Sequence, residues 1–317
     1  MSYHDFCCLV NSCLYEAVEF VKDDLLPDKK LDEPSYTAAI VTKFPDLMNR
    51  KWPWIKFGGC FIHKSPIVHF GKGRNCELGD LLVLCKKTMD SKLRYNAALF
   101  QLKTAKNSEK VKIGNKSKQL LLYTHWPQFS FNASDSNKYD IFPKAVTPGA
   151  QYMFINKEPL YCHSLCYCRC QRPIIFTDNI PSHIMENRAD SSFSRFLWDL
   201  IHWQTGRPIS DESEKDNDEW SRLIWDLIDR TRYKVFNLQN IQIQNRLQSN
   251  GDFFSFMTMQ NVQPALHLLY NNWVIGINGV KKDFHDDKKR KGILENTAYK
   301  EGISILFIDL DQINKFD

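Results

Sequence analysis

The sequence has no long hydrophobic run, and no stretch of it approaches the roughly 20 apolar residues of a membrane-spanning helix. Its opening stretch, MSYHDFCCLVNSC, has neither the basic head nor the long apolar run of a secretion signal. There is also no P-loop, no glycine fingerprint of a dinucleotide-binding fold and no Ser-His-Asp order. The sequence therefore predicts a cytoplasmic protein with no membrane contact, and it gives nucleotide-driven and acyl-transfer enzymes no support.

The composition is that of an ordinary globular protein. With 317 residues, of which 43% are hydrophobic and 25% charged, the chain can bury the core of one large domain or of two smaller ones. Its ten cysteines, in the absence of a secretion signal, indicate reduced thiols rather than a disulfide framework. The net charge is only +5, so the local clustering of lysines says more about partners than the total does.

The first half of the chain predicts a mixed α/β core over residues 1–160. Hydrophobic periodicity and turn residues indicate the following order: a helix at 5–22, a helix that opens after Pro34 and runs through SYTAAIVTKFPDL, strands at 54–63, 78–85 and 95–103, a helix in KSKQLLLYTHW before Pro127, and a strand at 150–156. A helix, three strands, a helix and a strand suit a mixed central sheet with flanking helices.

Residues 161–317 read differently and predict a helical or α+β elaboration. Aromatic amphipathic helices are expected at 193–203 and 220–232, and a strong strand at 302–311. The acidic stretch between the two helices, residues 210–219, is expected to be a flexible loop. We expect this half to contact nucleic acid or a protein partner, or to mediate self-association.

Three polar residues are expected to meet at one edge of the predicted sheet. Gln101 and Lys103 are two apart on a strand and therefore project together, with Leu102 pointing to the opposite face. If this strand pairs with the one that follows Asp80, the carboxylate approaches both of them. Asp80, the Gln101 side-chain oxygen and the Leu102 carbonyl are hard oxygen donors suited to Mg²⁺, and Lys103 can orient a water or neutralise developing charge.

The spacing Asp80…Gln101-x-Lys103, after a helix and a first strand, resembles the PD-(D/E)XK nuclease superfamily in its Q-x-K variant. Gln119 and Tyr123, in QLLLY, are similar to the Q-x-x-x-Y helix of the RecB and lambda-exonuclease branch. The resemblance covers about half the chain. It implies a restriction-endonuclease-like core and nuclease activity dependent on Mg²⁺ or Mn²⁺. It also implies DNA as substrate, since the similar branches act in restriction, repair and phage defence.

The sequence departs from the family pattern in one respect that matters for catalysis. Gln101 stands where the family usually has an acidic residue, so Glu77 is expected to supply the second anionic metal ligand, with Glu33 at the start of the second helix as the weaker candidate. An alternative is a catalytically inactive nuclease-fold module that binds nucleic acid or a protein. A second alternative is that Asp80, Gln101 and Lys103 are only a turn and a solvated strand end.

Two further groups of residues are candidates for binding. Lysines between residues 106 and 118 are expected to bind phosphates without reading sequence, above all Lys110, Lys112 and Lys116. A cysteine-rich segment at 162–170 is an alternative zinc site, in which case the protein would be a zinc-stabilised interaction protein. That segment holds Cys162, His163, Cys166, Cys168 and Cys170.

Overall fold

The computed structural model confirms an α/β fold built on a mixed central sheet with flanking helices. It describes residues 1–25, 31–62, 65–71, 73–105, 110–112, 117–134, 136–156, 175–178, 184–186, 192–233, 254 and 301–311.

The central sheet is seven-stranded and mixes parallel and antiparallel neighbours. Along the sheet the strand order is β1-β12-β4-β5-β8-β9, and β11 pairs with the first half of β5. The pairs β12/β4 and β5/β8 are parallel, and the others are antiparallel. Its strands are β1 (Lys56–Cys60), β4 (Leu81–Met89), β5 (Lys92–Ala105), β8 (Ala150–Asn156), β9 (Ile175–Asp178), β11 (Arg207–Ile209) and β12 (Ser304–Asp309).

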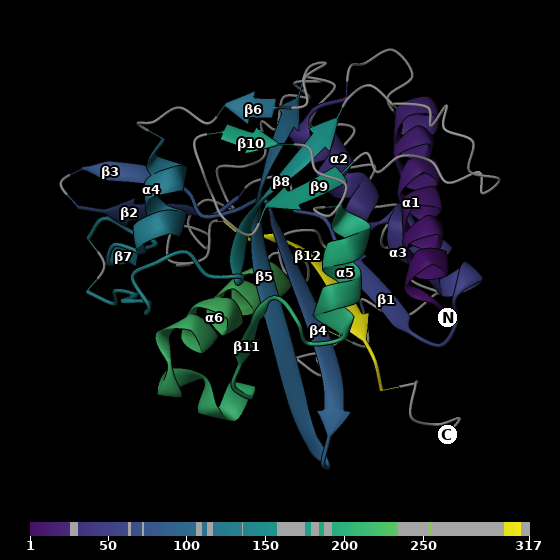
Figure 1. Ribbon diagram of the computed structural model, residues 1–317. Coiled ribbons are helices and arrows are strands. Elements are labelled where there is room, and N and C mark those ends of the chain that lie inside the picture. Colours follow the sequence, from purple (N-terminus) through teal and green to yellow (C-terminus); the bar gives the residue numbers. More distant parts are fainter. Residues whose placement is uncertain are drawn as a thin grey trace, which may run out of the picture.

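Helices cover both faces of this sheet, so the fold has three layers (Figure 1). One face packs against α1 (Tyr3–Phe20), α2 (Glu33–Val41), α3 (Lys43–Lys51) and α5 (Phe193–Ile201). The other face packs against α4 (Lys118–His125) and α6 (Glu219–Tyr233). Alternation along the strands feeds both cores: Leu81 and Val83 face the first, whereas Leu82 and Leu84 face the second.

Local sequence explains where the first helices begin. Ser2 caps α1 by accepting a hydrogen bond from the Asp5 N–H, and the buried side of α1 repeats at helical spacing. Asp32 and Ser35 form a capping box at the start of α2.

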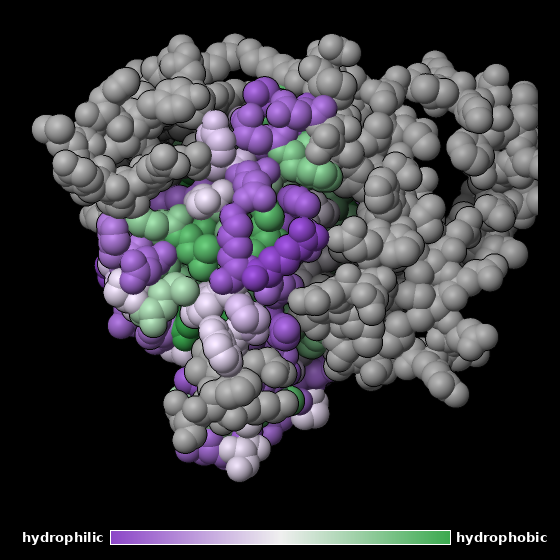
Figure 2. Space-filling view, turned by 90° about the vertical axis from the view of Figure 1, so that its right-hand side faces the viewer, coloured by the Kyte–Doolittle hydropathy of each residue, from purple (hydrophilic) through white to green (hydrophobic). Residues whose placement is uncertain are grey.

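On the side of the molecule that carries α1, hydrophilic residues cover most of the described surface, with smaller hydrophobic areas between them (Figure 2).

Helix α2 can approach the sheet closely because β1 carries a glycine at the point of contact. A Cβ atom at Gly59 would overlap the backbone carbonyl of Val41 and touch that of Ile305. Any larger residue would force α2 away from the sheet. This close packing places the N-terminal turn of α2 near the end of β5.

Strand β12 lies inside the sheet, between the edge strand β1 and β4, although more than 200 residues separate it from them in the chain. Ser304 fastens it by donating a hydrogen bond to the Ile62 carbonyl and accepting one from the Ile62 N–H. The sheet therefore takes strands from both sides of the predicted boundary at residue 160.

Two small sheets and two short helical segments complete the described structure. The small sheets are β3-β2-β7, made of β2 (Ile67–Phe70), β3 (Arg74–Glu77) and β7 (Phe129–Ser130), and β10-β6, made of β6 (Lys110–Lys112) and β10 (Ile184–Glu186). A π-helical turn, Val21–Leu25, extends α1, and a 3-10 helix, Glu212–Asn217, precedes α6.

Two sequence predictions about local structure were wrong. The helix expected after Pro34 is two helices, because the chain turns at Thr42, whose hydroxyl donates to the Ala38 carbonyl. The segment 210–219 is not an irregular loop, since most of it forms the 3-10 helix, in which Lys215 pairs with Asp226 and Asp229 of α6. Within the described residues, no helix combines the length and the hydropathy that crossing a lipid bilayer requires.

Candidate active site

The antiparallel pairing of β4 with β5 brings Asp80 and Gln101 together. Leu81 pairs with Phe100, and the Asp80 N–H donates a 2.8 Å hydrogen bond to the Phe100 carbonyl. Continuing this register by one residue sets Asp80 opposite Gln101, on the sheet face that carries α4. The structure thus meets the condition under which the sequence expects Asp80 to approach Gln101, namely that these two strands pair.

Three hydrogen-bond donors, two on β5 and one in the segment before β2, hold the Asp80 carboxylate. The Gln101 side-chain amide and the Leu102 N–H, the latter at 2.7 Å, both donate to Oδ2. The Ser65 hydroxyl donates to Oδ1 at 3.1 Å. These bonds fix the orientation of a carboxylate that is only partly exposed.

The surroundings of Asp80 make it a weak acid for an aspartate. Burial raises the pKa of its carboxyl to about 6, although the Leu102 N–H and the Lys103 ammonium both favour the charged form. The charges of Glu77 and Glu33 raise the pKa further. A carboxylate that is costly to ionise, with several charged neighbours, is common in functional sites.

Lys103 and Glu33 form the second part of the site. Lys103 lies two residues beyond Gln101 on β5, and its Nζ is 3.9 Å from Glu33 Oε2. Glu33 also accepts a 3.2 Å hydrogen bond from the Thr104 N–H, which ties the first turn of α2 to the end of β5. Asp80, Gln101, Lys103 and Glu33 thus meet where β4 begins and β5 ends.

The structure distinguishes the two glutamates that the sequence offered as the second acid. Glu33 contacts Lys103 and the β5 backbone directly. Glu77 is exposed at the end of β3, pairs with Ile67 of β2, and reaches the site only through the effect of its charge on Asp80. Glu33 is therefore the glutamate in direct contact with Lys103 and β5, whereas the charge of Glu77 acts on Asp80 more strongly than that of Glu33 does.

Helix α4 supports the backbone just before Asp80 through Tyr123. The Tyr123 side chain is buried, and its hydroxyl donates to the Leu78 carbonyl at 2.6 Å. Gln119, one turn earlier, is partly buried on the same helix. Gly79 lies between Leu78 and Asp80, and a Cβ atom there would come within 2.9 Å of the Tyr123 oxygen.

The oxygen atoms of the site are of the kind that a hard divalent cation prefers, and two carboxylates are among the groups that carry them. Asp80 and Glu33 supply these, and the Gln101 Oε1 atom is buried and has no hydrogen-bond partner among the described residues. Within the same residues, no three His, Cys, Asp or Glu side chains gather as a metal-binding group. A metal here would need the amide oxygen or backbone carbonyls to complete its oxygen ligands.

The remaining predicted residues are only partly within the described chain. Lys110 and Lys112 lie on β6, which pairs with β10, but their side chains are not described. Lys116 and the cysteine-rich segment 162–170 lie outside the described residues.

Sequence reasoning missed Ser65 and the carbonyl of Leu78 as parts of the site. Ser65 precedes Pro66 in a segment with no motif. Only the folding of the β2–β3 hairpin brings it close to Asp80. The Leu78 carbonyl is a backbone group, so the identity of the side chain gives no sign of its role. The sole hint in the sequence was Gly79, which marks a point of close backbone approach.

The chain matches no family model, no characterised protein and no solved structure in comparisons with each. The function therefore has to be argued from this site alone.

Proposed function

We propose that the protein is a metal-dependent nuclease whose active centre is formed by Asp80, Glu33, Gln101 and Lys103. The observation that carries the proposal is the convergence of two carboxylates, a lysine and an unpartnered amide oxygen at one edge of the sheet. The substrate proposed is DNA, and the cofactor Mg²⁺ or Mn²⁺.

Each residue has a separate task in this proposal. Asp80 and Glu33, with the Gln101 oxygen, would hold the cation. A bound cation would polarise the phosphodiester and lower the pKa of a water molecule. The Lys103 ammonium, positioned by Glu33 at 3.9 Å, would offset the negative charge that grows on the phosphate during attack.

The supporting residues would keep the Asp80 carboxylate oriented. Ser65 and the Leu102 N–H hold its two oxygens, and Tyr123 holds the backbone just before it. Orientation of this kind matters because a displacement of about 1 Å can lower a rate roughly a hundredfold.

The test is incubation of the full chain with plasmid DNA and, separately, with a structured RNA, across Mg²⁺, Mn²⁺ and Ca²⁺. We expect cleavage of DNA that requires Mg²⁺ or Mn²⁺ and stops with EDTA. Cleavage of RNA alone would correct the substrate. Absence of cleavage of either nucleic acid with any of these metals would count against an enzyme.

A second candidate is a catalytically inactive module on the same fold that binds nucleic acid or a protein. The observation in its favour is that the Gln101 amide donates to Asp80, an interaction that a neutral structural pair would also make. This candidate predicts DNA binding that is unaffected by divalent metal. The zinc-stabilised alternative stays a prediction, and stoichiometric zinc in the purified protein would support it.

A further inference from the structure

A cleft lies on the small sheet β3-β2-β7, whose strand β3 is followed in the chain by Asp80 of the candidate active site. Its volume is about 540 Å³. The β2–β3 hairpin forms one wall, and the connection from α4 through β7 forms the other. After β3 the chain continues directly through Leu78 and Gly79 to Asp80.

The turn of the hairpin is shaped by glycine. Gly71 and Gly73 have φ values of +56° and +70°, and the Gly73 N–H donates to the Gly71 carbonyl at 3.0 Å. A Cβ atom at either position would meet nothing within 4 Å. Glycine is thus required by the backbone conformation rather than by crowding, and open space surrounds the turn.

Backbone pairing on both sides holds the second wall of the cleft, the connection from α4 through β7, in place. His69 pairs with Ser130 across β2 and β7. Phe129 and Tyr139 exchange two backbone hydrogen bonds, of 3.1 and 2.7 Å, and their rings stack at 5.3 Å. Lys138, the neighbour of Tyr139, is thereby fixed at the rim of the cleft.

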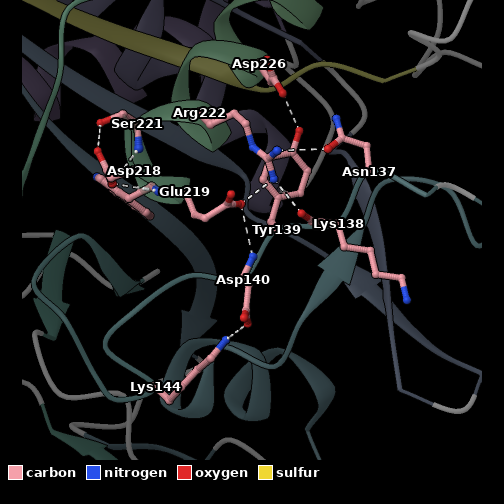
Figure 3. A network of polar contacts seen from close by, with 11 residues as sticks. Asn137, Lys138, Tyr139, Asp140, Lys144, Asp218, Glu219, Ser221, Arg222 and Asp226 are labelled. Atoms are coloured by element: carbon pink, nitrogen blue, oxygen red, sulfur yellow. Dashed lines mark hydrogen bonds and ion pairs between the residues drawn. The ribbon is translucent and has the colours of Figure 1, made fainter. Parts of the chain in front are cut away.

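The polar network behind this wall holds the backbone of Lys138 and leaves its ammonium outside (Figure 3). Arg222 of α6 donates to the Lys138 carbonyl at 2.6 Å, and the Tyr139 hydroxyl donates to Asp226 at 2.5 Å. In Figure 3 the Lys138 side chain runs away from these residues. Its charge is therefore not used by the network that positions it.

The cleft is basic. His69, Arg74 and Lys138 line it, and the described residues of its wall include no carboxylate. Among the described residues, neither Arg74 nor Lys138 forms an ion pair, and both are exposed. A guanidinium and an ammonium facing one hollow are suited to phosphate oxygens, the guanidinium as a fork and the ammonium as a point charge.

We propose that this cleft binds backbone phosphates of the nucleic acid that the candidate active site acts on, an inference that rests on the proposed function. Arg74 precedes Asp80 by six residues, so at most about 20 Å of chain separates them. Along a duplex, that length corresponds to roughly six base pairs. A duplex of about 20 base pairs is therefore long enough to contact both sites, with the cleft holding it at a distance from the bond facing Asp80.

The test measures binding of the full chain to a fluorescent DNA duplex of about 20 base pairs over a range of salt concentrations, with EDTA present. The test variant is Arg74→Ala/Lys138→Ala. The matched control is Lys92→Ala/Arg94→Ala, which removes the same charge from exposed positions at the far end of the β4–β5 hairpin. All four side chains are exposed, so both variants should unfold at the temperature of the parent.

We expect the cleft variant to bind roughly tenfold more weakly at low salt, and its log-affinity to fall less steeply with log salt by up to about two units. The control should resemble the parent. Parent-like binding by the cleft variant would overturn the proposal, and so would an equal loss in both variants, which would mean that only net charge matters. Because EDTA prevents metal-dependent cleavage, these outcomes are independent of whether the protein proves to be a nuclease.

Discussion

The Tyr123 hydroxyl donates a 2.6 Å hydrogen bond to the backbone carbonyl of Leu78, two residues before the Asp80 carboxylate. The phenol comes from α4 and the carbonyl from the chain that enters β4, so this bond joins a helix to the base of the candidate site. Gly79 is required between them because a Cβ atom there would lie 2.9 Å from the Tyr123 oxygen.

Tyr123→Phe should therefore reduce activity more than stability. Loss of the hydroxyl leaves a buried carbonyl unpaired, at a cost of about 1–2 kcal/mol in the free energy of unfolding. It also frees the backbone that orients Asp80, and we expect cleavage to fall at least about tenfold. Tyr95→Phe is the matched control, since Tyr95 is also buried but lies on β5 six residues before Gln101. Equal activities for the two variants would count against this positioning role.

Gly79→Ala should destabilise the protein less when Tyr123 is already phenylalanine. In the parent the new methyl group meets the phenol oxygen, whereas in Tyr123→Phe that contact is gone and only the Phe100 carbonyl, at 3.2 Å, remains close. A double-mutant cycle on urea unfolding should show favourable coupling of about 1 kcal/mol. Additive effects would show that the close approach is not a constraint.

Asp80→Asn should stabilise the folded chain at pH 8. Burial raises the pKa of Asp80 to about 6, so the folded state binds its proton more tightly than the unfolded state does. Stability from this group is present below about pH 4 and is lost as the pH rises to about 6, because the folded state then holds a charge in a poorly solvated place. Asparagine avoids that cost, and we expect a gain of roughly 1–2 kcal/mol at pH 8.

The measurement is urea unfolding of parent and variant at pH 8 and at pH 4. The stability difference should be close to zero at the lower pH. A variant that is less stable than the parent at pH 8 would mean that the hydrogen bonds to the carboxylate outweigh the cost of burying it.

Gln101→Glu separates a metal site from a structural pair. Gln101 is 1% exposed and its amide donates to Asp80, so a glutamate there sets two carboxylates side by side in a buried place. Without metal we expect a loss of several kcal/mol in stability. With Mg²⁺ much of the loss should be recovered and cleavage should equal or exceed that of the parent, because the new carboxylate is an anionic ligand.

Gln151→Glu is the control for this experiment. Gln151 is also fully buried on the central sheet, and its amide donates to the Pro148 carbonyl rather than to an acid. This variant should be destabilised to the same extent with and without Mg²⁺. If Mg²⁺ leaves both variants equally unstable, Gln101 does not face a metal.

Glu33→Gln and Glu77→Gln test which glutamate completes the site. Glu33 contacts Lys103 and the Thr104 N–H, whereas Glu77 is exposed and influences Asp80 only through its charge. Cleavage should fall about 10–100-fold in Glu33→Gln and change little in Glu77→Gln. A larger loss of cleavage in Glu77→Gln than in Glu33→Gln would mean that Glu77 is the second acid of the site.

The β4–β5 hairpin and its polar ends could be predicted from sequence because the signals are local. Alternation places Gln101 and Lys103 on one side of a strand, and the short connection makes the pairing with the strand after Asp80 the simplest one. The place of β12 could not be predicted in this way, since periodicity shows that residues 304–309 form a strand but not which distant strands they join.

Similar reasoning explains why the sequence favours Glu77 over Glu33 as the second acid. Glu77 is close to Asp80 in sequence, whereas Glu33 reaches the site only because α2 packs on the sheet through Gly59. The small sheet around His69 and Arg74 was missed because β3 is short and mostly exposed, without the hydrophobic alternation that marks a strand.

The most direct test of the central claim is the ratio of DNA cleavage rates of the parent and Lys103→Ala, purified side by side and assayed in saturating Mg²⁺. Lys103 is partly exposed at the end of β5, so its loss should leave the fold intact, which the unfolding temperature checks. Lys92→Ala, at the far end of the same strand, is the control. We expect a ratio of at least about 100 for Lys103→Ala and close to one for Lys92→Ala. A ratio near one for Lys103→Ala would mean that any cleavage comes from elsewhere, and it would contradict the proposed active centre.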